Sequence, residues 1–276
     1  MVIRRGIRQT YPAPAWLDRA TINRAAPRLD PPDAEPYYVC MNHLHTHSTN
    51  KHEPAPTLSP AALPPQAGCT PGGRTLELLR FRATPPATTA EIDDASARVG
   101  AYLPTLPGFE QRQIARSADG LLIDAVVWES LEQAEDASLV FMSSPEALSL
   151  LSRVDFSTVS IIHPRVLRSL RYATTPPAHL EAVVFRAKPG TTRRAFLDAF
   201  DNAEPHFRAT PGLLSHELAL APDGQWVHLV RWTDALSHDA AAKSLPSKPD
   251  VGVWFSMING PQMTLTRGDI VPGRTP

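Results

Sequence analysis

The stretches Thr75-Leu-Glu-Leu-Leu-Arg-Phe-Arg-Ala83 and His179-Leu-Glu-Ala-Val-Val-Phe-Arg-Ala187 decide the fold, because each resembles the other. Phe81 and Phe185 occupy the same place in the two copies, at an offset of 104 residues (185 − 81 = 104). The offset also holds for four later pairs: Pro107-Gly108 with Pro211-Gly212, Asp119-Gly120 with Asp223-Gly224, Trp128 with Trp232, and Pro145 with Pro249. A single register across turns, strands and a tryptophan indicates an internal repeat that arose by duplication.

Each copy is predicted to form the elements β-α-β-β-α-β in that order. An alternating apolar strand comes first, at about 75–83 and 179–187. In the second copy, residues 191–200 offer a threonine cap and apolar residues at helical spacing. A Pro-Gly pair ends this helix, and two strands joined by an Asp-Gly turn follow, since glycine tolerates the positive φ of a tight hairpin. A second helix begins after each tryptophan, and a last strand near 156–163 or 261–267 closes the copy.

This element order predicts an α+β fold built on the ferredoxin-like plan. An antiparallel sheet of this kind has helices on one face only, so its other face needs a partner. The second copy is the available partner, and we therefore expect two tandem ferredoxin-like βαββαβ repeats packed sheet to sheet. The expected boundaries are 74–165 for the first repeat, 166–178 for a linker and 179–271 for the second repeat. Residues 1–73 are dense in proline and show no apolar period, which is typical of a disordered tail.

Composition excludes several classes of protein. The formal net charge of −1 over 276 residues offers no positive field for nucleic acid. No apolar run reaches the roughly 18 residues that a membrane span needs, and no secretory signal is apparent at the start. Both cysteines, Cys40 and Cys69, lie in the predicted tail, so no disulfide is expected in the folded part. Cytoplasmic localisation is the expectation.

Short motifs in both copies carry a family resemblance. The first copy has Pro107-Gly-Phe109, the Asp119-Gly hairpin and Val126-Val-Trp128-Glu-Ser130, and the second has Pro211-Gly-Leu213, Asp223-Gly and Val230-Arg-Trp232-Thr-Asp234. With these motifs the chain resembles the antibiotic biosynthesis monooxygenase superfamily of dimeric α/β barrels, over about residues 74–271. The resemblance implies that the two repeats replace two single-domain subunits as an intramolecular pseudo-dimer. It leaves open whether two chains associate further into a homodimer.

The resemblance also implies a range of activities. Family members include cofactor-free oxygenases of polyketide quinols and haem-degrading enzymes. The leading expectation is cofactor-free oxygenation of a small aromatic or quinol-like compound. One alternative is a non-catalytic small-molecule binding or stress-response protein, and another is haem binding or degradation. The oxygenase branch places an asparagine four residues before the motif tryptophan, where this chain has Asp124 and His228.

Two catalytic candidates follow from these positions. The period of two in a strand places Asp124 and Trp128 on one face, and His228 with Trp226 and Trp232 on another. A histidine has a pKa near working pH, so His228 is a candidate general base toward a phenolic substrate, with Asp124 as its counterpart. The structural alternatives are a hydrogen-bonded interior histidine for His228 and a salt bridge for Asp124.

The second copy carries additional aromatic and polar residues. Trp226 and Trp254 stand where the first copy has leucine, and tryptophan offers a large stacking area to a flat ligand. We therefore expect the pocket in the second copy, with the substrate-binding candidates Trp226, Trp232, Trp254, His206 and His216, and with Trp128 as the counterpart in the first copy. Trp128 and Trp232 have an alternative role as core residues that clamp the second helix.

No cofactor is expected for the leading function. The resemblance implies that a haem-degrading member would have its ligating histidine on the helix after the tryptophan motif, and His238 is the candidate there. The tail holds a histidine tract, made of His43, His45, His47 and His52. Such a tract can bind a transition metal incidentally, so no metal site is predicted in the folded part.

Overall fold

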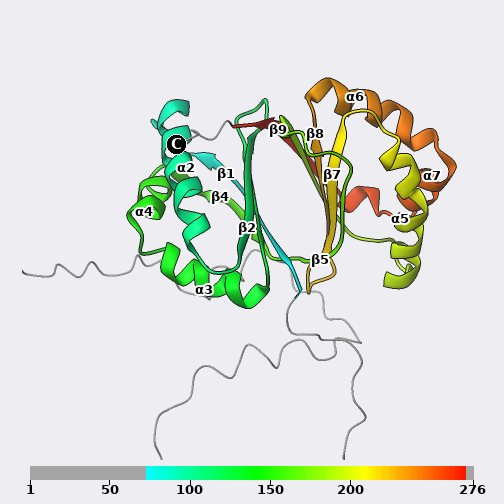
Figure 1. Ribbon diagram of the computed structural model, residues 1–276, viewed down its shortest axis with the longest axis horizontal. Helices are drawn as coiled ribbons and strands as arrows, with labels where there is room; N and C mark the ends of the chain where they lie inside the picture. Colours follow the sequence, from blue (N-terminus) through cyan, green and yellow to red (C-terminus); the bar gives the residue numbers. More distant parts are fainter. Residues whose placement is uncertain (1–72, 272–276) are drawn as a thin grey trace, which may run out of the picture. The chain divides into compact units, whose positions relative to one another are not determined.

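The computed structural model describes residues 73–271 (Figure 1). The predicted tail, its histidine tract and both cysteines lie outside the described residues. Between residues 73 and 271, no helix is long and apolar enough to cross a membrane.

The first repeat follows the predicted order, with its second helical stretch divided in two. Its elements are β1 (Thr75–Ala83), α2 (Thr89–Tyr102), the short 3-10 helix η3 (Leu103–Thr105), β2 (Phe109–Arg116), β3 (Leu122–Trp128), α3 (Leu131–Phe141), α4 (Pro145–Leu151) and β4 (Val154–Ile162). Thr88 and Glu91 form a capping box at the start of α2, and Ser130 caps α3 through the backbone N–H of Gln133. Pro145 begins α4, at a position where a missing N–H costs nothing.

The second repeat has the same order at the same offset. Its elements are β6 (His179–Phe185), α5 (Arg193–Arg208), β7 (Leu213–Leu220), β8 (Trp226–Trp232), α6 (Ala235–Ser244), η4 (Leu245–Ser247), α7 (Pro249–Ser256), η5 (Gly260–Gln262) and β9 (Thr264–Ile270). Thr192 caps α5, which confirms the predicted threonine cap, and Asp234 caps α6. Gly120 and Gly224 take φ values of 83° and 82° in the two predicted hairpin turns, a conformation in which a side chain would be strained.

The predicted linker is wrong in its first part. Residues Arg165–Arg171 form a further strand, β5, which pairs antiparallel with β7 of the second repeat and meets β1 at Thr75. The arginines of this segment, Arg165, Arg168 and Arg171, made it resemble a solvated linker. The structure pairs it because the edge of β7 presents backbone groups that need partners. Only residues 172–178 form an irregular connection.

Strand pairing joins the two repeats into a closed barrel. The order β3-β2-β9-β6-β8-β7-β5-β1 returns to β3, because β1 also pairs with β3, while β4 lies on the outer part of β1. Strand β9 makes the second connection between repeats, with Ala115 opposite Ile270 and Arg116 opposite Asp269. The barrel therefore has one connecting strand from each repeat.

The core forms three clusters in line with the expected packing. One cluster lies between the sheets and contains inward-facing residues of both repeats, among them Leu78, Ile123, Leu180 and Leu229. The other two lie beneath the helices of each repeat. Figure 1 shows α2, α3 and α4 outside one group of strands and α5, α6 and α7 outside the other. The predicted α+β fold with ferredoxin-like order of elements is thereby confirmed.

Candidate functional site

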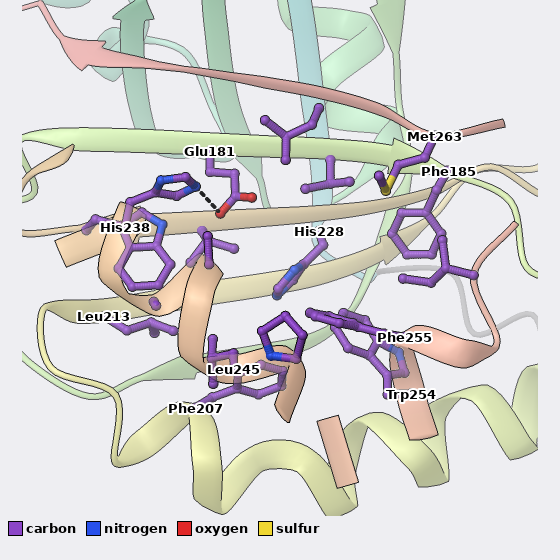
Figure 2. A pocket seen from close by; sticks show the side chains of 18 of the residues that line it. Glu181, Phe185, Phe207, Leu213, His228, His238, Leu245, Trp254, Phe255 and Met263 are labelled. Atoms are coloured by element: carbon purple, nitrogen blue, oxygen red, sulfur yellow. Dashed lines mark ion pairs between the residues drawn. The ribbon is translucent and has the colours of Figure 1, made fainter. Parts of the chain in front are cut away.

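The second repeat encloses a cavity between its sheet and its helices. The cavity has a volume of about 340 Å³, and its walls come from β6, β8, α6, α7 and β9. Figure 2 shows His228 in the middle of this cavity, between the Glu181–His238 pair at one end and Phe185 with Met263 at the other. The first repeat has a cavity at the corresponding place, and its volume is about 100 Å³.

The two cavities are lined by equivalent positions, so their difference in size has an identifiable cause. Gly260 lines the larger cavity, whereas the position 104 residues earlier holds Phe156, which lines the smaller one. Leu245 likewise corresponds to Phe141. A Cβ atom at Gly260 would meet no atom within 4 Å, so the space there is open. Smaller side chains at these two positions enlarge the cavity of the second repeat.

His228 is a buried polar residue in the wall of the larger cavity and belongs to a hydrogen-bonded chain. Its Nε2 lies 2.9 Å from Nδ1 of His216, and Nε2 of His216 lies 2.9 Å from the hydroxyl of Tyr172. The hydrogen bond to His216 uses Nε2 of His228, which leaves Nδ1 as the ring nitrogen available to a ligand. The His228 ring packs edge-to-face against Phe200 and Trp254, which fixes its orientation.

Burial keeps both imidazoles neutral. It lowers the pKa of His216 to about 3. Burial, reinforced by the neighbouring His216, lowers the pKa of His228 well below its ordinary value. Burial also raises the pKa of the Tyr172 hydroxyl, so this group stays protonated. A neutral imidazole has one N–H donor and one lone pair, so the chain can accept a proton at one end and release one at the other.

A second polar pair lies at one end of the cavity. Nε2 of His238 is 3.5 Å from Oε2 of Glu181, and its Nδ1 lies 3.1 Å from Asp239 and 2.6 Å from Arg267. The hydrogen bond to Glu181 raises the pKa of His238, against the opposing effect of burial. The pair is a hydrogen-bonded group that can orient a polar substituent of a ligand.

His238 changes the contacts of the motif tryptophan. In the first repeat, Ala134 occupies the equivalent position, and the indole Nε1 of Trp128 donates to Glu77 at 3.0 Å. In the second repeat, the corresponding Glu181 pairs with His238. Nε1 of Trp232 is consequently buried without a partner among the described residues.

The structure brings only some of the predicted site residues to the larger cavity. His228, Trp232 and Trp254 line it. Trp226 instead packs on Phe196 in the core, with ring centroids 4.4 Å apart. His216 lies behind His228, in the second place of the hydrogen-bonded chain.

The remaining predicted residues lie elsewhere. His206 pairs with Asp250 at 3.2 Å, near the surface between α5 and α7. Asp124 and Trp128 line the smaller cavity of the first repeat. The carboxylate of Asp124 forms a buried ion pair with Arg112 at 2.6 Å, which is the structural alternative considered for it.

The ion pair and the histidine pair occupy equivalent positions. Arg112 corresponds to His216 and Asp124 to His228, at the offset of 104 residues. The same pair of positions on two neighbouring strands therefore holds an ion pair in the first repeat and a hydrogen-bonded pair of neutral imidazoles in the second.

Sequence reasoning missed Glu181 and Tyr172. Glu181 carries a detectable signal, because it alternates with Val183 and Phe185 on one face of the first strand of its repeat. Tyr172 carries no such signal, since it lies just beyond a segment that resembles a linker and reaches His216 only through the pairing of β5 with β7.

The residues around His238 do not fit the ligation of haem. Both ring nitrogens of His238 are engaged, one by Glu181 and the other by Asp239 and Arg267. An axial ligand needs one free imidazole nitrogen. No cluster of three or more metal-ligating side chains occurs in the described part of the chain.

Comparison with known proteins places these features in a family. Residues 179–248 match the sequence model of the antibiotic biosynthesis monooxygenase family. The second repeat is therefore similar to this family over residues 179–248, as the motifs around Trp232 imply. No curated protein sequence matches the chain.

Solved structures share the fold at low sequence identity. A proposed monooxygenase from Fusobacterium nucleatum superposes with a TM-score of 0.56 and 11% identity, over 72% of this chain and 91% of that protein. An anthrone oxidase-like protein gives a TM-score of 0.54 and 12% identity, over 72% of this chain and 92% of its own length. A chlorite dismutase from Candidatus Nitrospira defluvii gives a TM-score of 0.51 and 8% identity, over 74% of this chain and 93% of that protein. These similarities concern the fold.

Proposed function

We propose that the cavity of the second repeat binds a small aromatic or quinol-like compound and that the protein oxygenates it without a cofactor. The observation that carries the proposal is neutral His228, which lines a cavity that is apolar apart from the Glu181–His238 pair and which is held through Nε2 by His216. The match of residues 179–248 to the sequence model of the monooxygenase family supports it. We also infer that the two repeats take the place of two subunits, with the first repeat as the scaffold.

The size of the cavity supports a small organic ligand. Its volume of about 340 Å³ falls in the range of about 300–1,000 Å³ that is typical of small-molecule sites. The cavity of the first repeat, at about 100 Å³, falls below this range. Trp232 and Trp254 offer aromatic surface, while Glu181 and His238 offer polar contacts at one end.

The proposed chemistry needs a base in a dry site. His228 accepts a proton at Nδ1 from an acidic CH₂ group of a hydroxylated aromatic substrate. The resulting carbanion transfers electrons to dioxygen as a carbon–oxygen bond forms, and the peroxide anion regains one proton. Loss of water then leaves a carbonyl group. The apolar walls exclude water and keep His228 neutral and able to accept.

Dioxygen uptake with a dihydroanthracene-type quinol mimic tests the proposal. We expect His228→Ala to lower the turnover rate by roughly 100-fold or more, the usual contribution of a general base. Gly260→Phe should fill the cavity and abolish both turnover and the rise in Tm caused by the mimic. The matched control is Phe156→Gly, which enlarges the cavity of the first repeat and should leave turnover unchanged.

The outcomes separate the competing functions. A rise in Tm with the mimic but no dioxygen uptake would contradict the oxygenase and favour a non-catalytic binding protein. Equal turnover in the wild type and in His228→Ala would remove His228 from the mechanism. An equal loss of turnover in Gly260→Phe and Phe156→Gly would show that the site is not specific to the second repeat.

A further inference from the structure

We propose that His228, His216 and Tyr172 form a proton relay that connects the cavity to the surface of the protein. The relay rests on the proposed function and adds two residues and a route to it. Its two contacts, His228 to His216 and His216 to Tyr172, both measure 2.9 Å, which is the normal length of a hydrogen bond.

The fold places the three side chains on three adjacent strands. His228 lies on β8, His216 on the neighbouring β7, and Tyr172 directly follows β5 on the far side of β7. The backbone N–H of Tyr172 donates to the carbonyl of Leu214 at 2.8 Å, which continues the pairing of β5 with β7. The position of Tyr172 is therefore fixed by the strand that connects the two repeats.

The two ends of the chain have different surroundings. His228 lines the cavity, and His216 is fully buried. Tyr172 is only half-buried, and its ring lies beneath the guanidinium of Arg208, 5.3 Å from the ring centroid. A proton that enters at His228 can thus leave at Tyr172 without crossing the apolar core.

The low proton affinity of the pair explains why a relay is needed. Burial disfavours an imidazolium at either histidine, so a proton accepted from the substrate would be held poorly at His228. Passing the proton onward leaves both rings neutral. The two histidines then transfer the proton onward, and neither of them remains as a charged imidazolium.

The transfer balances in each direction. Nδ1 of His228 accepts the substrate proton, and its Nε2 proton passes to Nδ1 of His216. The Nε2 proton of His216 passes to the oxygen of Tyr172, which releases its hydroxyl proton to water. The reverse sequence returns one proton to the peroxide anion in the cavity. One outward and one inward transfer per turnover restore the starting arrangement of hydrogen bonds.

The first repeat has no corresponding proton relay among its described residues. Its equivalent positions hold the Arg112–Asp124 ion pair, and Arg112 also donates to the carbonyl of Ser96 at 2.8 Å. A guanidinium does not give up its proton in a protein, so this pair cannot conduct. The relay accordingly occurs in the repeat that has the larger cavity.

Tyr172→Phe is the informative variant, because it removes one hydroxyl and preserves the ring. Tyr102→Phe is the matched control, since Tyr102 is a half-buried tyrosine of the first repeat. In the full chain labelled with ¹⁵N-histidine, Tyr172→Phe should shift the ring nitrogen resonances of both His216 and His228. Tyr102→Phe should shift neither. A shift confined to His216 would overturn the relay, because it would show that the two rings are not coupled.

Kinetics with the dihydroanthracene-type quinol provide the second measurement. Tyr172→Phe should lower kcat by about 10-fold or more with KM unchanged, a loss typical of impaired proton transfer. The dependence of the wild-type rate on the D₂O fraction should be curved, because several protons move, and should become linear in the variant. An unchanged kcat in Tyr172→Phe, with turnover abolished in His228→Ala, would overturn the relay and leave the proposed function standing. Coupled nitrogen resonances without any turnover in the wild type would support the chain and overturn the proposed reaction.

Discussion

The buried pair His216–His228 should make the protein less stable in acid, and its removal should reverse this effect. In the folded protein the pKa of His216 is lowered to about 3 by burial, and that of His228 is also lowered. In the unfolded chain both groups return to a pKa of about 6.5. A histidine whose pKa is lower in the folded state leaves the stability of the protein unchanged at pH values above its unfolded-state pKa. As the pH falls below that value toward the folded-state pKa, the unfolded state takes up the proton first and the stability decreases. The double variant His216→Leu/His228→Leu removes both groups.

The size of the effect follows from the two pKa values of His216. Between pH 7 and pH 5 the unfolded state gains most of one proton at this position, while the folded state gains almost none. The free energy of unfolding therefore falls by about 2 kcal/mol from His216 alone. His228 adds up to the same amount again, so the pair lowers stability by about 2–4 kcal/mol over this range.

Urea unfolding at pH 7 and pH 5 measures this difference. The double variant should lose about 2–4 kcal/mol less than the wild type on going to pH 5. The raised pKa of His238 makes the folded protein more stable as the pH falls. His238 is present in both the wild type and the double variant, so its contribution cancels in the difference between them. Equal losses in the wild type and the double variant would refute the reasoning, because they would show that the buried pair takes up protons as freely as the unfolded chain.

Three further variants test the contacts that hold the fold together, each by urea unfolding at pH 7. Asp124→Ala should lower the free energy of unfolding by about 3–5 kcal/mol, because it leaves Arg112 buried without its partner, and a change below 1 kcal/mol would contradict a buried pair. Gly268→Ala should cost about 1–3 kcal/mol, since its Cβ would lie 2.3 Å from the backbone of β2 at the junction of the repeats, and full stability would disprove this close approach. Trp128→Phe should cost about 1 kcal/mol more than Trp232→Phe, because only the first tryptophan has a hydrogen-bonded indole, and equal costs would argue against that difference.

The sequence by itself determined the repeat, the order of elements and the class of fold. Hydrophobic period, helix caps and Asp-Gly turns are local signals, and the offset of 104 residues requires only a comparison of the chain with itself. It also indicated which repeat holds the larger cavity, because Trp254 and His228 have no aromatic or histidine counterpart in the first copy. The face that each strand residue occupies followed from the period of two.

Tertiary structure alone decided which polar residues meet. The arginine-rich segment 165–171 became a strand because the edge of β7 needed a partner, and this pairing brings Tyr172 to His216. The repeat offset makes Gly260 and Phe156 equivalent, but only the packing of the strands and helices shows that they line the two cavities and set their size. Burial lowers the pKa of His216 and His228 only when distant strands pack together. The ion pair between Asp124 and Arg112 likewise forms only in the folded barrel. Contacts of this kind depend on the summed geometry of the whole barrel, which no local pattern in the sequence encodes.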